Sequence, residues 1–138
     1  MSGPRRKARV LVLKALYEVD LTGHSMEAVL DRLLAEETLP AEAAQYAREV
    51  AQSVLGHRER IDGIIARCAP AFPLGQTSAV DRNIMRLAIC EALIDNRTPA
   101  KVAINEAVEL AKAFGAESSP RFVNGVLGCA CFPDRAGA

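Results

Sequence analysis

The sequence predicts a single all-α domain, built as a bundle of about seven helices. The chain has 138 residues, 50% hydrophobic and 25% charged, and this length suits one globular domain with its own core. Only 4% of the residues are aromatic, tryptophan is absent, and helix formers such as Ala, Leu and Glu are abundant. Apolar residues recur three and four positions apart along most of the chain. We expect one domain over residues 1–138, with 1–4 and 133–138 flexible.

Four helices are expected in the first half of the chain. They cover residues 5–22, 25–36 and 41–55, and a shorter helix through Cys68 follows. Gly23 ends the first helix, Ser25 is the expected N-cap of the second, and Pro40 suits the start of the third. Gly56 then ends or kinks the third helix. Residues 69–77 contain two prolines and a glycine and are expected to form a loop.

Three helices are expected in the second half. Residues 84–94 are apolar nearly all round, apart from Arg86 and Glu91, so their helix is expected at the centre of the bundle. Thr98 and Ser119 each precede a proline, and their hydroxyls are expected to cap the two helices that follow. The sequence thus indicates where each of the last two helices begins.

The last two helices combine apolar faces with glycines and isolated polar residues. Phe114 is expected to face inward just before Gly115 ends its helix. Gly125 and Gly128, inside the final helix, suit a close approach between helices. Three polar side chains in these helices are interpreted as buried hydrogen-bonding or helix-pairing groups rather than catalytic ones: Asn105, Glu106 and Asn124.

Charge is distributed unevenly along the chain. Lys plus Arg and Asp plus Glu each total 17, yet the first fourteen residues contain five basic residues and no acidic one. Four of these lie at the amino end of the first helix, where they add to its positive dipole end: Arg5, Arg6, Lys7 and Arg9. The cluster favours a polyanion as ligand, and a solvated leader that improves solubility explains a basic run equally well.

The first helix also carries a second face opposite its core stripe. This face mixes a cation, apolar groups and an aromatic ring, at Arg6, Val10, Leu13 and Tyr17. Such a mixture suits a partner, either protein or RNA. The alternative is that the other half of the bundle covers this face, and the sequence leaves both explanations open.

Neither catalysis nor a metal or cofactor site is expected. The chain has two histidines, His24 and His57, and both are interpreted as solvent-facing. Its four cysteines are interpreted as buried thiols, and Cys129 and Cys131 lack the further ligands that a metal site needs. A glycine-rich phosphate loop and an apolar run of about 18 residues are both absent. We expect a cytoplasmic protein that contacts no membrane.

Several blocks of the sequence together resemble the NusB family of transcription antitermination factors. The blocks are RRKAR (5–9), ALY (15–17), VDR (80–82), RLA (86–88), VAINEAVELAK (102–112), FG (114–115) and FVNGVL (122–127). The resemblance covers about residues 5–130 and implies an all-helical monomer or homodimer. It also implies binding of boxA RNA together with NusE, a ribosomal protein of the small subunit. The resulting complex helps RNA polymerase to read through terminators in ribosomal RNA operons.

Carried over by position, the resemblance implies RNA contacts for five residues: Arg5, Arg6, Lys7, Arg9 and Phe122. Phe122 matches an aromatic residue near the RNA path of the family. A few cations and one stacking ring should hold single-stranded RNA weakly, and more weakly as salt rises. We expect that removing the four positive charges weakens RNA binding without unfolding the domain, because surface substitutions disturb little packing.

The resemblance also implies a surface for the protein partner. Tyr17 and Asp81 match positions near the surface that faces NusE. Ser118 departs from the family, which often has an acidic residue there, close to both the RNA and the partner. This departure bears on the balance of affinity between RNA and partner.

Two other functions are consistent with the same features. NusB-like domains also form the RNA-binding amino-terminal part of ribosomal RNA cytosine methyltransferases, but this sequence contains no domain suited to a methyl donor. A structural module is the other alternative, in which the first helix drives self-association and hides the basic segment. The mass of the protein in solution distinguishes this module from an RNA-binding monomer.

Overall fold

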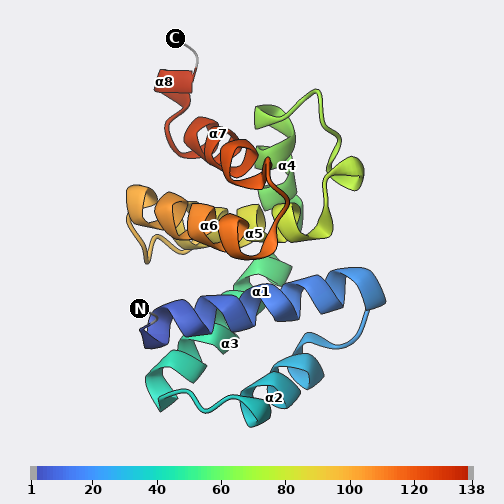
Figure 1. The fold of residues 1–138 in the computed structure, drawn as a ribbon, viewed down its shortest axis with the longest axis vertical. Helices are drawn as coiled ribbons and strands as arrows, with labels where there is room; N and C mark the ends of the chain where they lie inside the picture. Colours follow the sequence, from blue (N-terminus) through green and yellow to red (C-terminus); the bar gives the residue numbers. More distant parts are fainter. Residues whose placement is uncertain (1–2, 137–138) are drawn as a thin grey trace.

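The computed structural model describes residues 3–136, which fold into helices joined by loops (Figure 1). The helices are α1 (Pro4–Thr22), α2 (Met26–Glu36), α3 (Ala41–Gly56), α4 (Arg58–Cys68), α5 (Ala79–Ile89), α6 (Ala100–Phe114), α7 (Ser119–Cys131) and α8 (Pro133–Ala136). Two further segments are the 3-10 turn η1 (Leu74–Gln76) and the π-helical segment η2 (Cys90–Ile94). Over residues 3–136 there is no β-strand, which confirms the all-α prediction.

The halves of the chain occupy different parts of the bundle. In Figure 1, α1, α2 and α3 lie in the lower half, and α4, α6 and α7 lie in the upper half. Residues 1–2 and 137–138 lie outside the described part of the chain. Pro4 begins α1 and residues 133–136 form α8, while the flexibility that we expected for 1–4 and 133–138 stays a prediction.

Local chemistry sets several helix boundaries as expected. Gly23 ends α1 in the left-handed conformation, with φ 74°, which a residue without Cβ adopts easily. The Ser25 hydroxyl accepts the Ala28 N–H at 3.4 Å and caps α2. Gly115 follows the last residue of α6, and a Cβ built there would lie 2.6 Å from the Ser119 side chain. Glycine is therefore the residue that this turn accommodates.

The caps predicted before the two prolines are wrong, although helices do begin nearby. α6 starts at Ala100, and the Thr98 hydroxyl donates to Glu91 at 2.7 Å instead of capping the helix. The reason is that a buried carboxylate without donors costs more than an uncapped helix end, which water can solvate. α7 starts at Ser119 itself, and the Ser119 hydroxyl accepts the Ala116 N–H at 2.9 Å.

Three other packing expectations are also wrong. Phe114 is 42% exposed, because other residues form the buried side of α6: Ala103, Ala107, Leu110 and Ala111. Gly125 and Gly128 do not mark a close helix contact, since nothing lies within 4 Å of a Cβ built at either position. Cys68 and Cys129 are joined in a disulfide rather than kept as buried thiols, because α4 packs against α7 and brings their Cα atoms to 5.8 Å.

The segment from α5 into η2 runs through the centre of the bundle. Every residue from 83 to 92 is buried, which confirms the central position predicted from its apolar sequence. Three of these buried residues are nevertheless polar: Asn83, Arg86 and Glu91. Their side chains must therefore find partners inside the protein.

Glu91 is the polar centre of this core. Its carboxylate accepts Arg9 Nε at 3.1 Å, Arg9 Nη2 at 3.0 Å, the Thr98 hydroxyl at 2.7 Å, and the hydroxyl of Tyr46. These donors come from α1, from the segment before α6 and from α3. One carboxylate thus ties together three parts of the chain that are distant in sequence.

We predict that Glu91→Ala lowers the free energy of unfolding by about 3–5 kcal/mol, because the buried Arg9 guanidinium loses its closest counter-charge and keeps only the longer contact to Glu106. Urea unfolding followed by circular dichroism measures the change. As a control, Glu42→Ala alters an exposed carboxylate on α3 and should change the free energy by about 0.5 kcal/mol or less. Equal effects of the two substitutions would contradict the central role of Glu91.

Candidate functional site

Two cations at the start of α1 face solvent. Arg5 and Lys7 are exposed, and neither is paired with a carboxylate of residues 3–136. The guanidinium carbon of Arg5 lies 3.9 Å from the centroid of the Tyr46 ring, a cation–π contact between α1 and α3. The first turn of α1 therefore presents two positive charges, one of which rests on an aromatic ring.

Arg6 is bound to α6 by a two-pronged ion pair. Its Nε donates to Glu106 Oε1 at 3.0 Å and its Nη2 donates to Oε2 at 2.6 Å. The hydrogen bond from Arg6 holds the pKa of Glu106 below its usual value, so this carboxylate stays charged. The pair confirms that Glu106 is a hydrogen-bonding group, and it fixes the start of α1 against α6.

Arg9 belongs to the core rather than to the surface. It is 7% exposed, and besides Glu91 its Nη1 contacts Glu106 at 3.5 Å. Our premise that all four basic residues lie at the surface is therefore wrong for Arg9. Its removal would leave the buried Glu91 carboxylate without its counter-charge. An RNA contact by Arg9 itself stays a prediction.

Phe122 forms an aromatic pair with a residue that the sequence analysis missed. It is half-buried on α7, and its ring meets that of Phe72 edge to face, with centroids 5.6 Å apart and an interplanar angle of 76°. Phe72 is 59% exposed and lies in the loop over 69–77. The signal that could have found it is an aromatic residue between two prolines of a predicted loop. The Cys68–Cys129 disulfide holds the start of this loop beside α7.

The second face of α1 is partly covered and partly open. Leu13 is buried, whereas Tyr17 is 40% exposed and Leu21 is 54% exposed. Together with Val80 of α5 and Phe114 of α6 they line an open groove of about 380 Å³. Neither of the two explanations left open by the sequence holds for the whole face: the bundle covers Leu13 and leaves the side chains of Tyr17 and Leu21 exposed.

Asp81 and Ser118 lie at the starts of α5 and α7. Asp81 follows Val80 of the groove, is buried, and has one carboxylate oxygen, Oδ1, that meets no hydrogen-bond donor among the described residues. Ser118 is exposed and lines a different depression, with Glu117 and Arg121. The structure therefore brings Asp81 close to the Tyr17 groove, whereas Ser118 is not among the residues that line it.

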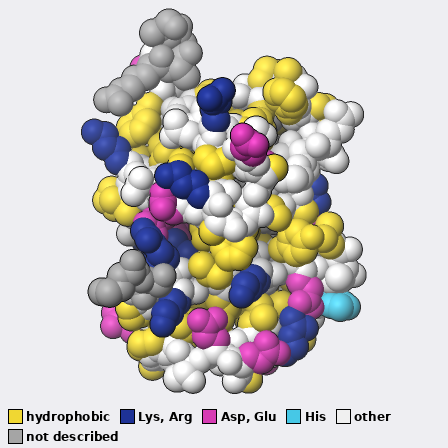
Figure 2. All heavy atoms as spheres, viewed as in Figure 1, with side chains coloured by type: hydrophobic (Ala, Val, Ile, Leu, Met, Phe, Trp, Pro, Cys, Tyr) yellow, Lys and Arg dark blue, Asp and Glu magenta, His cyan; other side chains and the backbone are white. Residues whose placement is uncertain are grey.

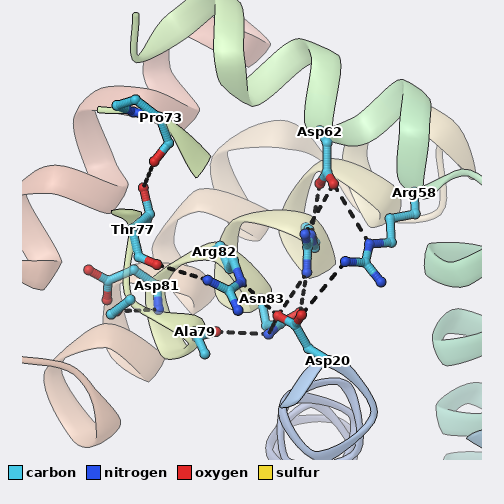
Figure 3. A network of polar contacts seen from close by, with 11 residues as sticks. Asp20, Arg58, Asp62, Pro73, Thr77, Ala79, Asp81, Arg82 and Asn83 are labelled. Atoms are coloured by element: carbon cyan, nitrogen blue, oxygen red, sulfur yellow. Dashed lines mark hydrogen bonds and ion pairs between the residues drawn. The ribbon is translucent and has the colours of Figure 1, made fainter. Parts of the chain in front are cut away.

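A cluster of ion pairs fixes the carboxyl end of α1 to α4 and α5 (Figure 3). Asp20 Oδ2 accepts Arg82 Nε at 2.7 Å, Asn83 Nδ2 at 2.9 Å and Arg86 Nη1 at 3.1 Å. Arg86 also binds Asp62 of α4 through two hydrogen bonds of 2.8 and 3.0 Å. In Figure 3 the Asp81 carboxylate points away from this cluster.

The charges around Asp20 determine its protonation. Burial favours its protonated form, but the hydrogen bonds from Arg82 and Asn83 and the charge of Arg86 prevail, so the pKa of Asp20 lies below its usual value. The carboxylate is therefore charged at neutral pH and binds the three side chains as an anion. This anchoring holds in place at the groove both Tyr17, about one turn before Asp20, and Leu21, the residue after it.

Comparison with known proteins places the chain in a family. The family model described as the NusB family matches residues 6–130. The chain belongs to the NusB family. Transcription antitermination protein NusB of Dehalococcoides mccartyi is 51% identical over 127 residues, which cover 92% of this chain and 89% of that protein.

Two solved structures share the fold. T. maritima NusB superposes with a TM-score of 0.87 at 36% identity, covering 95% of this chain and 92% of that one. A crystal structure of the antitermination factors NusB and NusE in complex with dsRNA contains a chain with a TM-score of 0.85 at 27% identity, covering 94% and 97%. The family resemblance seen in the sequence and its helical fold are confirmed.

The described part of the chain has neither a metal-binding cluster nor a membrane-spanning helix. Residues 3–136 contain no group of three or more His, Cys, Asp and Glu side chains arranged to hold a metal ion. Over the same residues, no helix is both long enough and apolar enough to cross a membrane. His24 and His57 are exposed, as expected.

We predict that the contribution of Asp20 to the free energy of unfolding decreases at low pH. Because its folded pKa is below the usual 3.8, the contribution is present above that pH and is lost as pH falls through 3.8 towards the folded value. Wild type should therefore exceed Asp20→Asn in urea midpoint at pH 7, and the difference should shrink at pH 3. A difference that stays constant from pH 7 to pH 3 would show that Asp20 ionisation is not the cause.

Proposed function

We propose that this protein is a transcription antitermination factor that binds boxA RNA together with the ribosomal protein NusE. In this proposal the assembly joins RNA polymerase in the elongation complex and supports read-through of ribosomal RNA operons. Membership of the NusB family and the name of its 51% identical relative support the function. The role is one of binding in the cytoplasm and includes no catalytic step.

The observation that carries the proposal is the presence of two different surfaces on α1. Its first turn presents the cations Arg5 and Lys7, and its last turns present Tyr17 and Leu21 beside an apolar groove. The two surfaces are about 20 Å apart along the helix, from the 1.5 Å rise per residue. One rigid helix can therefore bind RNA near its start and a protein near its end at the same time.

The cationic surface suits an RNA backbone. Arg5 and Lys7 are free to pair with phosphates, and Arg6 can share its guanidinium between Glu106 and a phosphate. Phe122 and its neighbour Phe72 offer aromatic rings on which bases can stack. Arg9 contributes indirectly, because its ion pair with Glu91 holds α1 in place.

The groove at the other end of α1 suits a protein partner such as NusE. Exposed Tyr17, Leu21 and Phe114 would leave water on binding, and buried aromatic residues dominate the affinity of many interfaces. Asp81 follows Val80 of this groove in sequence, but its Oδ1 is buried, so in this proposal the exposed groove residues make the first contacts with the partner. The same groove can hold a second copy of the chain, and a homodimer formed this way would compete with NusE.

Because this protein has few free cations, we expect the RNA to be recognised by the protein and a partner together. A few phosphate contacts give weak binding that falls as salt rises. A partner bound on the same helix adds contact surface to the RNA and raises the affinity through effective concentration. In this proposal NusE supplies that second part.

We predict that Arg5→Ala with Lys7→Ala weakens binding of labelled boxA RNA by roughly tenfold at low salt. The plot of log K against log salt should also become shallower by about 1.4, the value for two lost phosphate contacts on a single strand. Fluorescence anisotropy with and without NusE, and with a scrambled RNA, measures both quantities. Arg60→Ala with Lys112→Ala removes two other exposed charges and is the matched control. Equal affinities of the two double variants would refute this assignment.

We predict that Tyr17→Ala weakens NusE binding about 30-fold, as loss of an interfacial aromatic of about 2 kcal/mol implies. Isothermal titration calorimetry measures the affinity, and Val102→Ala, an exposed apolar residue that does not line the groove, is the control. Light scattering on wild type and Tyr17→Ala tests the other occupant. A dimer that becomes a monomer on substitution would assign the groove to a second copy of the chain.

A further inference from the structure

A second groove, between α6 and α7, is accounted for by neither of these surfaces. It measures about 540 Å³. α6 contributes Lys101, Ile104, Asn105 and Val108, and α7 contributes Arg121 and Asn124. These positions are three and four residues apart on each helix, so each set shares one helical face. The groove has an apolar floor between two cations and two amides.

The four polar side chains of this groove are unused by the fold. Lys101, Arg121, Asn105 and Asn124 form no hydrogen bond or ion pair with any residue of 3–136. Asn105 and Asn124 are exposed, which makes our interpretation of them as buried groups wrong. Other polar residues of α6 are paired, as Lys112 is with Glu109 at 3.1 Å. The unpaired groups of α6 thus gather on the side that faces α7.

The two helices that form the α6–α7 groove also carry residues of the proposed RNA surface. Asn105 is next in sequence to Glu106, which binds Arg6 of α1, and Arg121 precedes Phe122 on α7. Lys and Arg side chains are spread over the face shown in Figure 2, from the lower helices to the upper ones. One acidic residue, Glu117, lies beside Arg121 in the adjoining depression. The lining of the groove itself contains two cations, two amides and no carboxylate.

We propose that the α6–α7 groove binds a segment of the same RNA, with Lys101 and Arg121 on phosphates and Asn105 and Asn124 on base edges. This inference rests on the proposed RNA-binding function and extends the site beyond α1 and Phe122. Each Asn amide offers both a donor and an acceptor, as base edges do. Ile104 and Val108 form an apolar floor for the face of a base.

The two pairs of side chains should affect binding in different ways. Phosphate contacts raise affinity for every sequence and make it salt-dependent, whereas contacts to base edges discriminate between sequences. Lys101→Ala with Arg121→Ala should weaken boxA and scrambled RNA alike, roughly tenfold, and make the salt plot shallower by about 1.4. Asn105→Ala with Asn124→Ala should weaken boxA RNA roughly tenfold and leave scrambled RNA and the salt plot nearly unchanged.

The test is fluorescence anisotropy of the full chain with labelled single-stranded boxA and scrambled RNAs at several salt concentrations. The control for the cations is Lys112→Ala with Arg60→Ala, and the control for the amides is Gln52→Ala, at an exposed position on α3. Thermal melts check that each variant folds. If an alanine pair melts early, Lys101→Gln with Arg121→Gln and Asn105→Ser with Asn124→Ser replace it.

The outcomes separate this inference from the function on which it rests. The groove is supported if Lys101→Ala with Arg121→Ala makes the salt plot shallower and Asn105→Ala with Asn124→Ala reduces discrimination between boxA and scrambled RNA. If only Arg5→Ala with Lys7→Ala weakens RNA binding, RNA binding stands and the groove is refuted. If wild type does not select boxA RNA, with or without NusE, the proposed function fails and the groove fails with it. If the groove variants bind RNA normally but bind NusE weakly, the occupant is protein and the inference is overturned.

Discussion

The buried ion pair between Glu91 and Arg9 is the interaction on which the arrangement of this protein depends. A carboxylate at the centre of an apolar bundle is tolerated only where donors surround it, and here they come from α1, α3 and the segment before α6. The backbone carbonyl of the same residue accepts the N–H groups of Arg97 and Thr98 as the chain leaves η2. Both ends of the α5–α6 connection are thereby held to the amino-terminal helix. This internal contact anchors the helix that carries the surface cations.

Helix positions were predictable because their causes are local. Gly23 and Ser25 mark boundaries through the conformation and hydrogen bonding of single residues, and the apolar run of α5 places that helix at the centre. The family and its helical fold were also predictable, from blocks spread along most of the chain. Thr98 shows the limit of local reasoning: its hydroxyl donates to the Glu91 carboxylate, seven residues away, instead of capping the helix that follows.

The site was only partly predictable, because the burial and contacts of similar side chains depend on neighbours that are distant in sequence. Arg5, Arg9 and Lys7 are alike in sequence, yet one rests on Tyr46, one is buried on Glu91 and one is exposed. Nothing in the local charge pattern separates them. In the same way, the exposure of Asn105 and Asn124 depends on the groove formed by α6 and α7, and the role of Phe72 depends on the ring of Phe122. RNA and partner contacts themselves remain predictions.

The Cys68–Cys129 disulfide gives the fold a covalent topology that its helices alone do not have. The two residues are 61 positions apart, so the bond closes a ring of backbone that contains the loop over 69–77, the central α5 and the whole of α6. While the bond is intact, the unfolded chain cannot extend through this ring, and its conformational entropy is lower. The amino-terminal helices α1 to α3 lie outside the ring and gain no such constraint. Oxidation thus divides the chain into a tethered half and an untethered half, which are joined at the core by Glu91.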